Sequence, residues 1–104
     1  MVKNTRTPET DYLCDAVLTL KNREEVYQFL NDVCTVNEIQ SMAQRFTVAK
    51  YLMENMKYAE IKEVSGASTA TVSRVNRTLL YGEDGYALAV NRLKERGITG
   101  PGEG

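Results

Sequence analysis

The amino-acid sequence predicts an all-α protein of six helices. Glycine and proline hardly occur inside the periodic segments, and valine, isoleucine and threonine do not alternate over any useful length. Apolar residues instead recur at intervals of three and four, which is the spacing of one helix face. With 104 residues, of which 42% are hydrophobic and 26% charged, the chain has the size and composition of one globular domain.

Start signals mark the first two helices. Thr7 and Pro8 form a cap residue followed by proline at the first helical position. Asn22 and Glu25 have the spacing of a capping box. The apolar faces would be Leu13, Val17 and Leu20 in the first helix and Val26, Phe29, Leu30 and Val33 in the second.

The longest helix is predicted to follow Thr35, which has a capping-box partner in Glu38. The simpler interpretation of its apolar stripe is packing in the core of a single chain. The stripe is longer than one small domain usually needs, so burial against a second copy of the chain is the alternative. The stripe consists of Ile39, Met42, Ala43, Phe46, Ala49, Leu52, Met53 and Met56.

Three shorter helices are expected after Asn55. The first runs from about Lys57 to Val64, the second from Ser68 to about Leu80, and the third from about Asp84 to Arg96. Gly97 supplies the stop. The helical domain is thus expected to span residues 1–96, and the tail GITGPGEG, residues 97–104, is expected to be disordered.

Composition excludes several classes of protein. No stretch approaches the roughly 18 uncharged apolar residues of a membrane span, and the N-terminus lacks the apolar core of a signal peptide. We therefore expect a cytoplasmic protein without a membrane partner, and interpret Cys14 and Cys34 as buried reduced thiols. The absence of histidine, of a glycine-rich phosphate loop and of a metal-spaced cluster argues against an enzyme, a metal site or a required cofactor.

Charge is unevenly distributed although the net charge is only −1. Residues 7–40 carry seven acids against Lys21 and Arg23, whereas residues 41–82 carry six bases against three acids. No acid lies between Glu63 and Glu83. An acid-free stretch suits a surface that faces phosphates, and the alternative is an uncharged helix that packs on its neighbours.

The two short helices around Gly66 have the spacing of a helix-turn-helix at about residues 57–80. Gly66 lies where the chain must turn sharply, a position that commonly requires positive φ. Ser68 can cap the second helix. Ile61 and Val64 of the first helix are expected to face Val72, Val75 and Leu79 of the second.

The outward face of the second helix is small, polar and basic. Small side chains let a helix backbone approach the major-groove floor, where hydroxyls can hydrogen-bond and methyls can touch thymine. Basic side chains beside it would contact phosphates. The residues predicted to contact double-stranded DNA are Lys57, Lys62, Ser68, Thr69, Ala70, Ser73 and Arg77.

Two stretches carry a resemblance to a known family: TVNEIQSMAQRFTVAKYL at residues 35–52 and SGASTATVSRVNRTL at residues 65–79. The segment 35–80 resembles the Trp repressor superfamily, and the whole chain is similar to its YerC/YecD group of regulators. The resemblance implies an intertwined homodimer of six-helix subunits. Its two recognition helices would lie one DNA turn, roughly 34 Å, apart and face a pseudo-palindromic operator.

The resemblance also implies a candidate effector pocket. In the Trp repressor, tryptophan lies between two arginines of different subunits, and their counterparts here are Arg45 and Arg74. Thr35 and Thr78 match polar residues of that pocket. The family's tryptophan binder has glycine where this chain has Val75, whose side chain would occupy the space of the indole. Tryptophan is therefore not expected as effector. Ion pairs or phosphate contacts are the favoured roles of the two arginines, and a pocket for another small molecule is the alternative.

The sequence thus favours a sequence-specific transcriptional regulator, a repressor, that binds the major groove as a homodimer and performs no covalent chemistry. A helical protein–protein interaction module without specific DNA binding is the alternative, because the acidic first two helices would suit a basic partner. A steep dependence of duplex binding on salt would favour the regulator.

Overall fold

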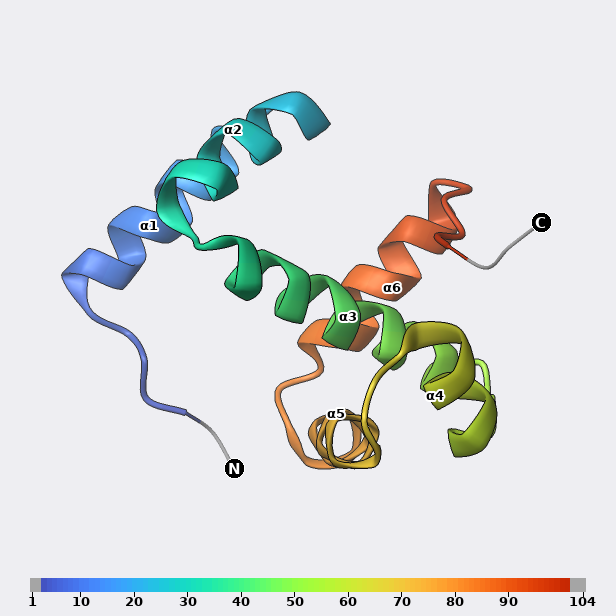
Figure 1. Cartoon of the computed structure of the whole chain (residues 1–104). Helices are drawn as coiled ribbons and strands as arrows, with labels where there is room; N and C mark the ends of the chain where they lie inside the picture. The colour runs from blue at the N-terminus through green and yellow to red at the C-terminus, as the bar shows by residue number, and fades with distance from the viewer. Residues whose placement is uncertain (1–2, 102–104) are drawn as a thin grey trace. The chain divides into compact units, whose positions relative to one another are not determined.

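The computed structural model describes residues 3–101, which form six α-helices and no strand (Figure 1). This result confirms the predicted all-α class. Whereas the sequence predicts one domain over 1–96, the described chain forms two compact units, 3–40 and 41–101, whose boundary falls within α3. The helices are α1 (Pro8–Leu18), α2 (Arg23–Val33), α3 (Val36–Met53), α4 (Tyr58–Ser65), α5 (Thr69–Tyr81) and α6 (Gly85–Glu95).

The first two helices begin at the predicted caps. Before α1, the Thr7 hydroxyl oxygen accepts a hydrogen bond of 3.0 Å from the backbone N–H three residues later. Before α2, the side-chain oxygen of Asn22 accepts from the Glu25 N–H at 2.9 Å. The Glu25 carboxylate in turn accepts from the Lys21 N–H at 2.9 Å. Each cap satisfies backbone donors that have no partner inside the helix.

The start of α3 has a reciprocal capping box. The Glu38 N–H donates to Thr35 Oγ1 at 3.1 Å, and the Thr35 N–H donates to Glu38 Oε1 at 2.7 Å. The Glu38 carboxylate accepts from the Thr35 backbone N–H and, with a smaller effect, from the Thr35 side chain; both hydrogen bonds lower the pKa of Glu38 because they favour the charged carboxylate.

This lowered pKa predicts a dependence of stability on pH. The ionised Glu38 stabilises the fold fully above its unfolded pKa of 4.5, and the contribution is lost as the pH falls through the lower folded value. Urea unfolding should therefore show wild type more stable than Glu38→Gln at about pH 7, with the difference vanishing at about pH 2. A difference that persists unchanged in acid would exclude the carboxylate as its source.

The C-terminus of α3 is set by a left-handed residue. Asn55 has φ of 63°, its N–H donates to the Leu52 carbonyl at 3.0 Å, and the Met56 N–H donates to the Tyr51 carbonyl at 3.1 Å. This pair of bonds is a Schellman motif, in which asparagine replaces the more common glycine. The helix consequently ends at Met53, a few residues before the end of the apolar stripe in the sequence.

The core of residues 41–101 joins α3 to the predicted helix-turn-helix. Its buried side chains come from α3, α4, the turn and α5: Val48, Ala49, Tyr51, Ile61, Ala67, Val72 and Val75. Leu52, Met56, Leu79 and Tyr86 are partly buried against this cluster. The cluster confirms the predicted packing of Ile61 with Val72 and Val75. The prediction that Val64 faces α5 is wrong. Its side chain is 56% exposed, and Ile61 is the buried residue of α4.

None of the residues 3–40 is buried. Large apolar side chains on α1 and α2 are exposed, among them Tyr12 at 79% and Leu18 at 82%. The prediction of buried thiols is wrong for Cys14, which is exposed, whereas Cys34 is half-buried; both are free. A single copy of this unit therefore leaves its apolar surface uncovered.

The last helix ends in a second Schellman motif. Gly97 has φ of 75°, its N–H donates to the Lys94 carbonyl at 2.9 Å, and the Ile98 N–H donates to the Leu93 carbonyl at 2.9 Å. Residues 98–101 lie beside α3 and α6, whereas the sequence predicts a disordered tail from residue 97. Residues 102–104 lie outside the described chain. No helix of the described chain is long and apolar enough to cross a membrane.

Candidate nucleic-acid interface

The turn between α4 and α5 depends on glycine. Gly66 ends α4 with φ of 71°, and its N–H donates to the Lys62 carbonyl at 3.0 Å. No atom lies within 4 Å of where a Cβ of Gly66 would be, so space is available and only the positive φ requires glycine. The Ser65 hydroxyl donates to the Ile61 carbonyl and accepts from the Ala67 N–H at 3.1 Å. These hydrogen bonds, which stabilise the turn, thus all lie within residues 61–67.

Two further contacts fix this turn on the rest of the unit. The side-chain amide of Gln44 on α3 donates to the Ser65 carbonyl at 3.3 Å. Ala67, directly after the turn, is 4% exposed and belongs to the buried cluster. Because α4 and α5 pack against each other and share one core with α3, the orientation of α5 is determined by buried contacts (Figure 1).

One face of α5 is buried and another is exposed. Val72 and Val75 are at most 2% exposed, which anchors the helix. The predicted DNA-contacting residues of this region are all exposed, and no acid occurs on α5. They are Ser68, Thr69, Ala70, Ser73 and Arg77.

Ser68 already has a local role. Its hydroxyl oxygen accepts from the Thr71 N–H at 3.1 Å, and the hydroxyl lies 3.1 Å from Thr71 Oγ1, to which it donates. Ser68 is therefore the N-cap of α5, as the sequence predicts. A direct contact between this hydroxyl and a DNA base would have to compete with the cap.

The predicted phosphate-contacting residues are exposed cations. Lys57 precedes α4, Lys62 lies on α4 and Arg77 lies on α5. None of the three forms an ion pair within residues 3–101. Their charges are consequently available to a polyanion, in contrast to Lys50, which is buried and paired with Glu54 at 3.7 Å.

A comparison with protein families shows to which family this chain is related. The model of the Trp repressor protein family matches residues 8–94, which include all six helices except the last residue of α6. This chain belongs to the Trp repressor family.

Individual members of the Trp repressor family confirm the assignment. Uncharacterized protein YerC of Bacillus subtilis (strain 168) is 50% identical over 94 residues, which cover 90% of each chain. The crystal structure of a candidate Trp repressor of Staphylococcus aureus has 54% identity and a TM-score of 0.83, over 86% of this chain and 89% of that one. A TrpR-like protein of Eubacterium eligens ATCC 27750 has 53% identity and the same TM-score, over 86% and 92%. The protein is a YerC-type member with a TrpR-like fold.

The residues predicted to form an effector pocket are all exposed in the described chain: Thr35, Arg45, Arg74 and Thr78. The Thr35 hydroxyl caps α3, and the Thr78 hydroxyl donates to the Arg74 carbonyl at 3.1 Å. Val75 is 2% exposed and belongs to the core cluster. Its side chain is thus a structural part of the core, as its spacing with Val72 predicts. Among the described residues no group of histidine, cysteine or carboxylate side chains could hold a metal ion.

The sequence-based prediction missed Gln44, Lys50 and Tyr51. Gln44 fixes the turn, while Lys50 and Tyr51 are buried and donate to the Pro101 carbonyl. The one sequence feature that could have indicated a buried polar contact is Lys50, which lies among apolar residues at 48–53 of a long helix. The partner of this lysine lies 51 residues away, and helical periodicity contains no information about such a pairing.

Proposed function

We propose that the protein is a sequence-specific DNA-binding transcriptional regulator, a repressor, that binds the major groove with α5 as a homodimer. The observation that carries the proposal is the exposed, acid-free face of α5 on a helix whose opposite side is anchored in the core. A rigidly held helix with small polar residues at its N-terminal end is the usual element for contacts with base edges.

Each exposed group on this face has chemistry that suits duplex DNA. Thr69 and Ser73 have hydroxyls that can donate to or accept from base edges, and the Ala70 methyl is small enough to contact thymine. The Arg77 guanidinium can bind a phosphate with two N–H groups. Lys57 and Lys62 add positive charge on the neighbouring helix, and such contacts fix the position of the protein on the duplex.

The homodimer is supported by the uncovered apolar surface of residues 3–40. The helices α1 and α2 have eleven residues each, none of them buried, and helices of that length are marginal without packing. Val36 at the start of α3 is 69% exposed, and Met42 is 39% exposed. A second copy that covers these side chains would give the protein two α5 helices, one for each half-site of an operator.

We further propose that DNA binding does not require tryptophan. The buried Val75 side chain belongs to the core at the position where the family's tryptophan binder has glycine, and it would take up space that an indole beside α5 needs. Arg45 and Arg74 are then available for ion pairs or phosphates.

The test is a fluorescence-anisotropy titration of the protein with random-sequence and genomic-fragment duplexes at about 50 and 200 mM salt. We expect affinity to fall steeply with salt, to be higher for some genomic fragments, and to be unchanged by added tryptophan. Arg77→Ala should reduce the slope of log K against log salt by about 1.8, about 0.9 for each of two phosphates in a dimer.

Arg92→Ala is the matched control, because it removes the same charge from the exposed end of α6 and should leave the slope unchanged. Sedimentation equilibrium on the same sample should give the mass of a dimer. Absence of binding to every duplex at both salt concentrations, with and without tryptophan, would refute DNA binding and favour a protein-binding module. A monomer mass would refute the arrangement of two half-sites.

A further inference from the structure

The described chain contains an apolar groove that the proposed function does not use. It lies between α3 and α6 and is closed on a third side by the residues that follow α6. Phe46 and Lys50 of α3 and Val90 and Leu93 of α6 line it, together with the segment 98–101. The chain's own C-terminal segment therefore forms one wall of the groove.

The sequence directs this segment into the groove. The Schellman motif at Gly97 places Ile98 two residues after the cap residue Arg96. An apolar side chain at this position frequently contacts the residue three before the cap, here Leu93. Ile98 and Leu93 both line the groove. Gly100 has φ of 83°, and a Cβ at this position would lie 3.6 Å from Lys50 Cδ, so the backbone passes directly against the lysine stem.

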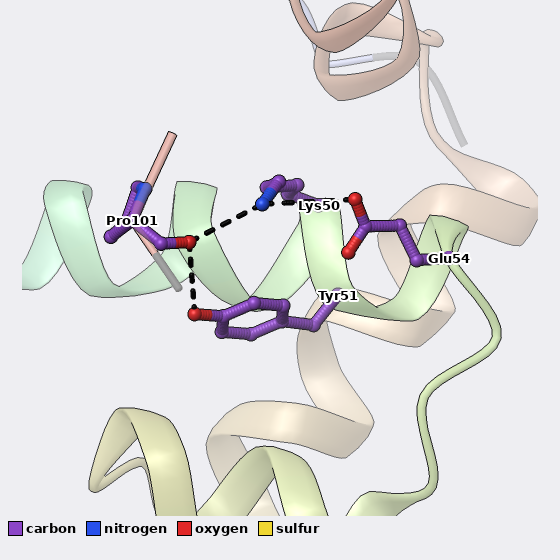
Figure 2. Close-up of polar contacts among 4 residues, drawn as sticks. All are labelled: Lys50, Tyr51, Glu54 and Pro101. Carbon is purple, nitrogen blue, oxygen red and sulfur yellow. Dashed lines mark hydrogen bonds and ion pairs between the residues drawn. The ribbon is translucent and has the colours of Figure 1, made fainter. Parts of the chain in front are cut away.

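Two buried side chains hold the end of the segment. Lys50 Nζ donates to the Pro101 carbonyl at 3.3 Å, and the Tyr51 hydroxyl donates to the same oxygen at 3.2 Å (Figure 2). Lys50 and Tyr51 are each 6% exposed. Glu54 lies 3.7 Å from Lys50 Nζ and balances its charge. Buried donors are costly to leave without an acceptor, which favours the docked position of Pro101.

Tyr51 links this segment to the recognition helix. Its hydroxyl contacts the Pro101 carbonyl, and its ring belongs to the buried cluster that contains Val72 and Val75 of α5. A shift of the Tyr51 ring would therefore change the surface on which α5 packs, because cores are close-packed and transmit displacement.

We propose that residues 98–101 form a C-terminal strap that docks on Lys50 and Tyr51 and braces α5 through the Tyr51 ring. The docked strap closes the groove between α3 and α6 and stabilises the core under the recognition helix. Release of the strap loosens α5 and lowers the affinity for DNA. This last consequence rests on the proposed function, whereas the docking and the bracing do not.

Hydrogen exchange of the full chain, measured by mass spectrometry, tests the strap without DNA. Tyr51→Phe removes one donor and keeps the ring, and Lys50→Met removes the other and keeps an apolar stem. Each variant should speed exchange about three- to ten-fold in residues 93–100 and, to a smaller extent, in α5.

Two matched controls should exchange as wild type does in both regions. Tyr58→Phe removes a hydroxyl from the start of α4, outside the groove, and Lys21→Met removes the ammonium of an exposed lysine that precedes α2. Unchanged exchange of 93–100 in both strap variants would overturn the docking. Faster exchange there, with α5 unchanged, would overturn the bracing.

Anisotropy titrations of the same variants separate the strap from the proposed function. Weaker duplex binding by Tyr51→Phe and Lys50→Met, but not by the two controls, would support the link to DNA. Wild-type affinity in both strap variants would overturn that link. If wild type binds no duplex, the proposed function fails, and the exchange data still decide whether the strap docks and braces α5.

Discussion

Ile61→Ala should lower the free energy of unfolding by about 2–5 kcal/mol. Ile61 is fully buried and is the one buried residue of α4. It packs in the cluster that joins α3 to Val72 and Val75 of α5. Removal of three carbons leaves a cavity between helices that are held together mainly by this cluster, so relaxation of the surroundings can fill little of it.

Val64→Ala is the matched control on the same helix. Val64 is 56% exposed, so its truncation should change the free energy of unfolding by less than about 0.5 kcal/mol. Urea unfolding followed by circular dichroism measures both variants, at one protein concentration because association of copies would shift the midpoint. Equal effects of the two substitutions would contradict the assignment of Ile61 to the core and Val64 to the surface.

Ala70→Glu should weaken binding to duplex DNA by about 100-fold or more. Ala70 is exposed near the N-terminus of α5, on a helix that has no acid in its first turn. A carboxylate there would face phosphates and acceptor-rich base edges, and juxtaposed like charges cost several kcal/mol. Fold stability should change little, because the methyl group is not part of the core.

Asn91→Glu provides the comparison for charge. It changes the net charge by the same amount at an exposed position of α6, and it should reduce affinity only slightly. Anisotropy titration measures affinity, and thermal unfolding confirms that both variants are folded. If the two substitutions weakened binding equally, the effect would come from net charge, and α5 would not be the surface that contacts DNA.

Much of the local structure was predictable because its causes lie within a few residues. Thr7, Asn22, Thr35 and Ser68 accept from backbone N–H groups three residues later, and each cap is present where the sequence predicts it. The packing of Val72 and Val75 followed from helical spacing on one element. The exposed face of α5 was predictable for the same reason, since whatever is not buried on an anchored helix is presented outward.

The sequence by itself determined the number, order and starts of the helices and the glycine turn of the helix-turn-helix. Only the tertiary structure decided that Lys50 and Tyr51 are buried, that Val64 is exposed, and that residues 98–101 lie beside α3. The physical reason is the sequence separation between the residues that make each contact. Caps and periodicity act over three to five residues, whereas Pro101 meets Lys50 and Tyr51 across 51 and 50 residues of chain. Such contacts exist only once the intervening helices have packed.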